Sequence, residues 1–391
     1  ARGRGRLFRQ ISRKIDVFWY NRISLVGKSG SQKGVKIMQL LVLAAGGGKR
    51  IKPIVTSKPL LPFMGKPLVE WVVDSCQVLK PSQTVIVINP KDQLAVKKLF
   101  PKAKIVIQAQ PTGMAGAVEA AGTVLAGPAV IVDGDDLIDP KIVSDFSRQI
   151  QKTPDKIILT GIKSNLSGGY FILQGSTLKV VEKPEKGEWF KLVLDYFPKI
   201  EEFIVALESV KTGKDDAYEQ ALNQLSFTLV KTAGDFYQLK YPWQVLDLTV
   251  GLLTGKPMID KTAKIMGGSE IINSYLGPGV VIGQNCLIRD SIIEAGTVVG
   301  FGTEITRSYV GPKNYFHRNY IGDSVIEGES NFGAGAVLAN FRFDHKPIGL
   351  SGRVKFGAIV GRGAQVGVNA SLMPGAMIAD DGLVWPGTVK Q

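Results

Sequence analysis

The chain contains two regions in which hydrophobic and polar positions follow different patterns. From Met38 to about Thr254, short apolar runs of strand length alternate with longer mixed segments, which is typical of an α/β domain. The apolar runs predict strands, and several of the mixed segments predict helices. Strands are expected at residues 39–44, 84–88, 129–132, 156–159 and 170–173, and helices at 68–79, 114–125 and 203–225, the last broken by a polar stretch at 211–216.

A period of six residues replaces this pattern toward the C-terminus. The aliphatic positions Val360, Val366, Leu372, Ile378 and Val384 lie six apart, and earlier triplets do the same before a five-residue step. A longer repeat with spacings of 17, 17 and 16 residues relates Ser-Tyr-Leu-Gly from 274, Ser-Ile-Ile-Glu from 291, Ser-Tyr-Val-Gly from 308 and Ser-Val-Ile-Glu from 324. Three short strands per coil, each with one inward aliphatic side chain, form a triangular prism. An ordinary antiparallel β domain would show alternation of period two, which is missing. We therefore predict a left-handed parallel β-helix of hexapeptide repeats, interrupted by a loop at 341–357.

Four parts are expected along the chain. Residues 38–255 form the α/β domain, 256–270 a linker rich in Lys and Gly, and 271–391 the β-helix. Residues 1–37 carry ten basic residues against one acid, which is +9 of the formal net charge of +14. We expect this extension to lie upstream of the true start or to be a solvated tail, and the alternative is a basic arm for nucleic acid or anionic lipid. Because the charge is concentrated there, nucleic acid is not the favoured partner.

Composition excludes several classes of protein. With 391 residues and 45% hydrophobic content, the chain can bury more than one core. Cys76 and Cys286 are isolated, which indicates neither a disulfide framework nor a cysteine-rich zinc site. No apolar run approaches the roughly 18 residues of a membrane span, and no signal-peptide core follows the N-terminal charges. These features predict a cytoplasmic protein without a membrane partner.

Three glycines follow the first predicted strand, in the sequence Ala45-Gly46-Gly47-Gly48-Lys49-Arg50. Glycines let the backbone approach phosphate closely and aim its N–H groups at the oxygens, and the two cations add charge. The loop is neither a Walker A motif, since it lacks G-K-[ST], nor a complete dinucleotide fingerprint. A phosphate site is predicted here, and the alternative is a plain tight turn.

Further motifs follow this loop. They are Lys58-Pro59-Leu60-Leu61-Pro62, Gly65-Lys66-Pro67, Gln110-Pro111-Thr112-Gly113, Asp133-Gly134-Asp135 and Glu182-Lys183-Pro184. In order and spacing, the series resembles the sugar-1-phosphate nucleotidylyltransferases. With the β-helix included, residues 38–391 resemble the two-domain branch of bifunctional uridylyltransferase/acetyltransferases, above all its archaeal-type members. The resemblance implies a fold of class α/β, with a Rossmann-like nucleotidyltransferase domain followed by a left-handed β-helix.

The resemblance also implies a reaction and a set of roles. A sugar 1-phosphate oxygen attacks the α-phosphorus of a nucleoside triphosphate, UTP or dTTP, and pyrophosphate leaves; this chemistry needs positioning and charge neutralisation. Arg50 and Lys58 are implied as catalytic cations. The implied binding residues are Ala45, Gly46, Gly47, Gly48, Gln110, Gly113 and Glu182, and the implied ligands of Mg²⁺ are Asp135 and Gln238.

Three positions depart from the family pattern. Lys49 stands where Thr is usual, Met114 where Thr or Ser is common, and Gln238 where an Asp or Asn would ligate the metal. An amide is a poorer ligand for a hard cation than a carboxylate. The alternative function is therefore a catalytically impaired regulatory or assembly subunit of the same architecture. Turn-forming roles for Asp133 and Asp135 and a surface role for Lys58 are the corresponding alternatives for single residues.

A second site is implied within the β-helix. Residues 314–323 resemble the acetyl-acceptor site of the bifunctional enzymes, in which a histidine takes a proton from the sugar amine as it attacks acetyl-CoA. His317 is the implied base, and the alternative is a corner residue without chemistry. The residues implied to bind the amino sugar phosphate are Tyr320, Asn331, Asn340, Lys346 and Lys355. Because such β-helices usually trimerise, a homotrimer is expected.

Overall fold

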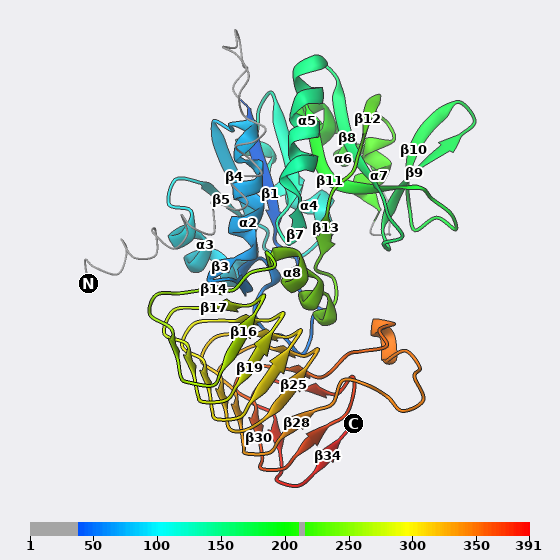
Figure 1. Cartoon of the computed structure of the whole chain (residues 1–391). Coiled ribbons are helices and arrows are strands. Elements are labelled where there is room, and N and C mark those ends of the chain that lie inside the picture. The colour runs from blue at the N-terminus through cyan, green and yellow to red at the C-terminus, as the bar shows by residue number, and fades with distance from the viewer. Residues whose placement is uncertain (1–37, 211–215) are drawn as a thin grey trace. The chain divides into compact units, whose positions relative to one another are not determined.

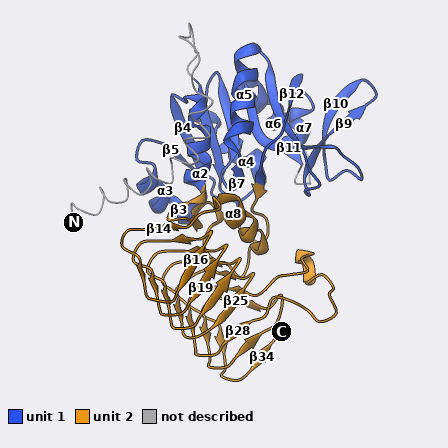
Figure 2. Cartoon of the chain, viewed as in Figure 1, with its two compact units in different colours: residues 1–47, 69–236 blue, residues 48–68, 237–391 orange. Residues whose placement is uncertain are grey.

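The computed structural model describes residues 38–210 and 216–391. The basic extension at 1–37 and most of the polar break expected at 211–216 lie outside the described residues. The chain divides into two compact units (Figure 2): unit 1 comprises residues 1–47 and 69–236, and unit 2 comprises residues 48–68 and 237–391. The segment 48–68 therefore belongs to the same unit as the β-helix, although it lies within the sequence of the predicted α/β domain.

Unit 1 is built on a nine-stranded mixed sheet. The strand order is β10-β9-β11-β6-β1-β4-β5, and β8 pairs with both β11 and β12 (Figure 1). β6, β1, β4 and β5 are parallel, whereas β11 runs antiparallel to β6. The strands are β1 (Gln39–Ala44), β4 (Gln83–Ile88), β5 (Lys104–Ile107), β6 (Ala129–Asp133), β8 (Ile157–Lys163), β9 (Gly169–Gln174), β10 (Thr177–Glu182), β11 (Trp189–Phe197) and β12 (Phe227–Thr232). All five predicted strands are present.

Helices cover the sheet of unit 1. On one face, Leu41 and Leu43 share an apolar cluster with residues of α4, α6 and α7. Leu40 and Val42, which point to the opposite face, are also fully buried, and burial on both faces explains why β1 is a continuous apolar run. The helices are α2 (Leu68–Ser75) with η2 (Cys76–Leu79), α3 (Gln93–Leu99), α4 (Gly113–Ala121) with η4 (Gly122–Val124), α5 (Pro140–Lys152), α6 (Ile200–Ser209) and α7 (Ala217–Leu222).

The C-terminal part of unit 2 is a stack of three-sided coils (Figure 1). Its strands form three parallel seven-stranded sheets, as the predicted left-handed β-helix requires. One sheet contains β14 (Met258–Ile259), β17 (Tyr275–Leu276), β20 (Ile292–Ile293), β23 (Tyr309–Val310), β26 (Val325–Ile326), β29 (Ile359–Val360) and β32 (Met377–Ile378). The second contains β15 (Lys264–Ile265), β18 (Val281–Ile282), β21 (Val298–Val299), β24 (Tyr315–Phe316), β27 (Asn331–Phe332), β30 (Gln365–Val366) and β33 (Leu383–Val384). The third contains β16 (Glu270–Ile272), β19 (Leu287–Arg289), β22 (Glu304–Thr306), β25 (Tyr320–Gly322), β28 (Val337–Leu338), β31 (Ser371–Leu372) and β34 (Val389–Lys390).

Two kinds of stacked side chain hold these coils together. The aliphatic residues of the six-residue period form one buried column along the axis, which confirms the predicted prism. The serines that open the coil repeat form a second column at one corner. Ser274, Ser291 and Ser308 each accept an N–H from the next coil, 3.1 Å away in every case. The repeat of 17, 17 and 16 residues is therefore a corner of the prism, and its serines satisfy buried backbone donors.

The first coil corrects the predicted linker at 256–270. β14 and β15 pair in register with β17 and β18, so the prism begins at Met258 rather than at 271. Ile259, Ile265 and Ile271 continue the period of six, but this end coil has no coil beyond it. Ile259 and Ile265 are consequently 46% and 40% exposed, and the surrounding Lys and Gly residues gave the segment the composition of a linker.

A long loop leaves the prism between β28 and β29 (Figure 1). It carries η6 (Gly349–Ser351) and two antiparallel bridges, Phe341 with Lys355 and Ile348 with Arg353. The predicted interruption at 341–357 is thus confirmed. The remaining elements are η3 (Pro90–Asp92) and β7 (Asp136–Ile138) of unit 1, η1 (Lys58–Leu60), β2 (Pro62–Phe63), β3 (Lys66–Pro67), η5 (Pro242–Gln244) and α8 (Val245–Leu252) of unit 2, and β13 (Phe236–Gln238).

Neither cysteine forms a disulfide, and both Cys76 and Cys286 are buried. Across residues 38–210 and 216–391, every helix is too short or too polar to cross a bilayer.

Candidate functional site

The strand order of unit 1 reverses between β1 and β6. The chain adds β4 and β5 on one side of β1 and then returns to place β6 on the other side. In open α/β sheets, ligands bind beyond the carboxyl ends of the strands at such a reversal. Ala45 and Gly47 follow β1 there, and the acidic turn begins at Asp133, the last residue of β6, and ends at Asp136, the first of β7. Two motifs that lie far apart in sequence therefore meet at the expected end of the sheet.

Gly134 fixes the acidic turn against the end of β1. Its N–H donates to the Leu43 carbonyl at 2.8 Å. A Cβ at this position would lie 3.0 Å from both the Ala44 Cβ and the Leu43 oxygen, closer than carbon normally packs. Glycine lets the turn that carries Asp133 and Asp135 pack this closely against β1.

We therefore expect Gly134→Ala to destabilise unit 1 by about 1–3 kcal/mol, since backbone atoms must shift to admit the methyl group. Thermal unfolding measured by circular dichroism would detect the loss. Gly46→Ala is the matched control for stability, because a Cβ at Gly46 meets nothing within 4 Å. Equal melting temperatures for the two variants would contradict the close packing at Gly134.

Three carboxylates converge in this turn. Oxygens of Asp133, Asp135 and Asp136 all lie within 4.8 Å of one another. Asp136 is buried, whereas Asp133 and Asp135 are half-buried. Carboxylate oxygens are the preferred ligands of Mg²⁺, which is commonly held by one or two of them and by substrate phosphates. The cluster fits a magnesium ion, and it adds Asp133 and Asp136 to the ligand predicted from sequence.

The Gln110–Gly113 motif lies beside the glycine loop. A Cβ at Gly47 would be 3.7 Å from the Pro111 ring, so the two backbones run close together. Buried Gln108 holds the motif by donating to the Thr112 hydroxyl at 3.1 Å and to the Gly113 carbonyl at 3.2 Å. Gln110 itself is exposed. Met114, one of the three departures, packs against the apolar cluster beneath α4, which gives it a role in packing.

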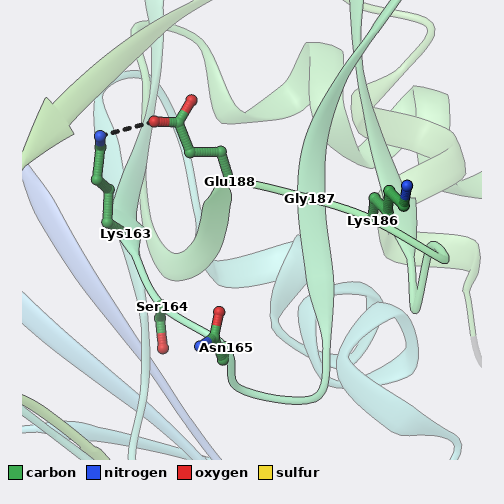
Figure 3. Close-up of a pocket in the computed structure, with 6 residues that line it drawn as sticks. All are labelled: Lys163, Ser164, Asn165, Lys186, Gly187 and Glu188. Carbon is green, nitrogen blue, oxygen red and sulfur yellow. Dashed lines mark ion pairs between the residues drawn. The ribbon is translucent and has the colours of Figure 1, made fainter.

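Glu182 ends the β9–β10 hairpin. It pairs in register with Gly169, and its carboxylate lies 3.5 Å from the Lys183 ammonium. The segments before β9 and after β10 line an open pocket of about 570 Å³. Its lining residues are Lys163, Ser164, Asn165, Lys186, Gly187 and Glu188. Lys163 and Glu188 form an ion pair of 2.7 Å on one side, and Lys186 lies apart from them (Figure 3).

Four predicted residues of the nucleotide site belong to unit 2. Gly48 has a φ of +62°, a conformation that favours glycine. Arg50 is exposed, and its guanidinium carbon lies 5.9 Å from the centroid of Tyr241. Lys58 begins η1, and Gln238 ends β13; both are half-buried. The chain passes from unit 1 to unit 2 between Gly47 and Gly48. Metal ligation by Gln238 stays a prediction.

Two predicted residues of the second site lie together on the prism. A Cβ at Gly322 would meet both the Asn340 amide nitrogen at 2.6 Å and the Tyr320 hydroxyl at 2.9 Å. Asn340 also donates to Asp323 at 2.5 Å. Asp323 in turn accepts two hydrogen bonds of 2.7 Å from the Arg307 guanidinium. Burial raises the pKa of the Tyr320 hydroxyl above its usual value.

The other predicted residues of this site lie apart from that cluster. His317 is exposed, and its backbone N–H donates to the Asn319 side chain at 2.5 Å. Asn331 is exposed on β27, where it aligns with Tyr315 of the previous coil. Lys346 and Lys355 are exposed on the loop that leaves the prism. Within residues 38–210 and 216–391, no hydrogen bond or ion pair joins these four side chains to Tyr320 or Asn340.

Sequence reasoning missed several residues of both candidate sites. Asp136 follows the recognised Asp133-Gly134-Asp135 motif directly, so its carboxylate was visible in the sequence. Arg307 and Asp323 lie at equivalent corners of successive coils, 16 residues apart, and the coil-length repeat could have paired them. Lys163 and Lys186 carry no local signal, because their segments are brought together by the pairing of β8 with β11, in which Lys163 lies opposite Trp189.

Comparison with known proteins gives the same picture. Residues 40–201 match the family model described as a MobA-like NTP transferase domain. The bifunctional sugar-1-phosphate nucleotidylyltransferase/acetyltransferase of Sulfurisphaera tokodaii is 26% identical, over 90% of this chain and 97% of its own. The bifunctional protein GlmU of Methanococcus maripaludis is 26% identical over 89% of this chain and 93% of its own, and that of Methanocaldococcus jannaschii 25% over 88% and 92%. These relatives confirm the predicted resemblance over both parts of the fold.

Proposed function

We propose that this chain, with its MobA-like NTP transferase domain at residues 40–201, transfers a nucleotidyl group from a nucleoside triphosphate to a sugar 1-phosphate. The products are a nucleotide sugar and pyrophosphate. The observation that carries the proposal is the convergence of Asp133, Asp135 and Asp136 at the strand-order reversal where the glycine loop follows β1. The names of the relatives, which span nearly the whole chain, support the same reaction.

Each proposed role follows from the chemistry of the residue. Backbone N–H groups of the glycine loop bind the triphosphate, and the cations Arg50 and Lys58 neutralise charge on the phosphates as the α-phosphorus is attacked. Gln110 and Gly113 contact the base. Glu182 binds the sugar, and Lys186 in the neighbouring pocket offers a cation to its phosphate. Asp135, with Asp133 and Asp136, would hold Mg²⁺, which when bound neutralises the phosphate oxygens.

A pyrophosphate-release assay tests the proposal. Purified protein with Mg²⁺ would be given each of UTP, dTTP, GTP and CTP with hexose 1-phosphates and N-acetylhexosamine 1-phosphates. We expect release that depends on both substrates, with UTP or dTTP preferred. Absence of release from every pair, together with binding of a triphosphate, would favour the regulatory or assembly subunit instead.

We propose a second activity, N-acetylation of an amino sugar phosphate by acetyl-CoA in the β-helix. The Tyr320, Asn340, Asp323 and Arg307 cluster beside the coil of His317 supports it, as do the bifunctional names of the relatives. His317 accepts the proton that the amine loses as it attacks the thioester, and coenzyme A leaves. Appearance of the free thiol with glucosamine 1-phosphate would measure the reaction. We expect His317→Asn to abolish the release of coenzyme A. We also expect sedimentation to show that the protein is a trimer.

A further inference from the structure

The coil repeat alternates at its fourth position. Gly277, Glu294, Gly311 and Glu327 occupy equivalent places after β17, β20, β23 and β26 of one sheet. The second position alternates as well, because Tyr275 and Tyr309 fall on the coils that carry glycine. A carboxylate on every second coil is not needed to build the prism, whose interior is apolar. The side chains of Glu294 and Glu327 are nevertheless buried, at 2% exposure each. Other residues must therefore cover them.

Glu327 binds the backbone of the segment 48–68. Its carboxylate accepts from the Val55 N–H at 3.0 Å, from the Thr56 N–H at 2.7 Å and from the Thr56 hydroxyl at 2.6 Å. Arg362, on the next coil, adds its own N–H to the carboxylate at 3.2 Å and donates to the Thr56 hydroxyl at 2.6 Å. Four donors therefore converge on one buried acid, which holds residues 55 and 56 against the prism.

Glu294 and Tyr309 bind the same segment ten residues later. Glu294 accepts the Gly65 N–H at 2.9 Å. The Tyr309 hydroxyl donates to the Pro62 carbonyl at 2.7 Å, and its ring lies 5.3 Å from that of Phe63. Three successive coils of repeat thus contact both ends of residues 55–65. Buried side chains of the prism therefore hold this segment at both ends.

The segment carries the two cations proposed for nucleotidyl transfer. Lys58 lies two residues after Thr56 and begins η1, whose Leu60 N–H donates to the Ser57 carbonyl at 2.9 Å. Arg50 is joined to Val55 through two consecutive turns, in which Ile51 donates to Gly48 and Ile54 to Ile51, each at 3.2 Å. A displacement at residues 55 and 56 would therefore be transmitted to both cations.

We infer that Glu327 and Glu294 are positioning residues for nucleotidyl transfer, acting from the β-helix through the backbone that carries Arg50 and Lys58. The inference rests on the proposed function. It assigns the prism a role in nucleotidyl transfer in addition to the proposed acetylation. A misplacement of about 1 Å far from the chemistry can cost on the order of 100-fold in rate.

Kinetics of Glu327→Ala test this inference at 25 °C, with folding checked by circular dichroism. We expect kcat for pyrophosphate release to fall by roughly 10- to 100-fold, with a smaller change in KM for the triphosphate, because the cations act mainly on charge that develops during transfer. Glu329→Gln is the matched control: it lies two residues away, is 49% exposed and pairs with Lys313 at 3.7 Å. The control should retain wild-type kinetics.

Hydrogen exchange supplies a readout that does not depend on activity. In Glu327→Ala, amides of residues 48–68 should exchange faster than in the wild type, while Glu329→Gln should match the wild type. If Glu327→Ala does not fold, two other variants weaken the same attachment. Thr56→Val removes the hydroxyl that donates to the carboxylate, and Arg362→Ala removes the guanidinium that donates to Thr56 and lies 3.7 Å from the carboxylate. Each should lower kcat by about 3- to 10-fold, as loss of one ordinary hydrogen bond would.

The outcomes separate the two proposals. A wild-type protein that releases no pyrophosphate overturns the proposed function and this inference with it. An active wild type whose folded Glu327→Ala variant keeps kcat within twofold overturns the positioning role alone. A wild-type kcat in both Thr56→Val and Arg362→Ala would also overturn the positioning role alone.

Discussion

Asp135→Asn should lower the rate of nucleotidyl transfer by roughly 100- to 1,000-fold, the loss typical when one group that stabilises developing charge is removed. The substitution keeps the shape of the side chain and removes its charge. Asp133 and Asp136 remain within the cluster, so residual activity is expected. Initial rates of pyrophosphate release at saturating substrates would measure the change. The Mg²⁺ concentration that gives half the maximal rate should rise in the same variant.

The control for this experiment is another acid of unit 1. Glu208→Gln also removes one negative charge, from an exposed position in α6 outside the proposed site, and should leave the rate unchanged. If Asp135→Asn retained more than a tenth of the wild-type rate with an unaltered Mg²⁺ requirement, the acidic turn would be a structural turn. The regulatory-subunit alternative would then gain support.

Much of the fold was predictable because its elements correspond to local patterns of hydrophobic residues in the sequence. β1 is buried on both faces and appears as an unbroken apolar run, and the axial column of the prism appears as aliphatic residues six apart. The acidic turn was likewise visible as a short motif after a buried strand. Such features depend on neighbours within about ten residues, which a sequence displays directly.

Features that depend on distant partners were not predictable in this way. The first coil of the prism carries Ile259 and Ile265 in period, but the exposed end of a stack has the composition of a linker. Val55 and Glu327 are 272 residues apart in sequence, so no local pattern assigns the segment 48–68 to the unit of the β-helix. The alternation of Gly277, Glu294, Gly311 and Glu327 is visible in the sequence, but nothing in it identifies the segment 48–68 as the partner of the two glutamates.

Glu294→Gln should make the stability of the protein less dependent on pH. Burial raises the pKa of the Glu294 carboxyl from 4.5 to about 7, although hydrogen bonds from the Gly65 and Met64 backbone oppose the shift. The titratable groups that face it are the buried phenols Tyr275 and Tyr309, which stay neutral in this range. The unfolded chain loses the proton near pH 4.5 and the native chain near pH 7. Between these values the native state binds more protons, so stability falls as pH rises, by about 3 kcal/mol in total.

Glutamine cannot titrate, so the variant should lack this slope. Free energies of unfolding from urea denaturation at pH 5, 6, 7 and 8 would give the difference between variant and wild type. We expect that difference to shift in favour of Glu294→Gln by about 3 kcal/mol between pH 4.5 and pH values above 7, and to stay constant beyond. Glu329→Gln, at an exposed acid of the same prism, should show no comparable shift. A difference that is equal at pH 5 and pH 8 would mean that Glu294 is ionised throughout, held as an anion by the backbone of the segment it binds.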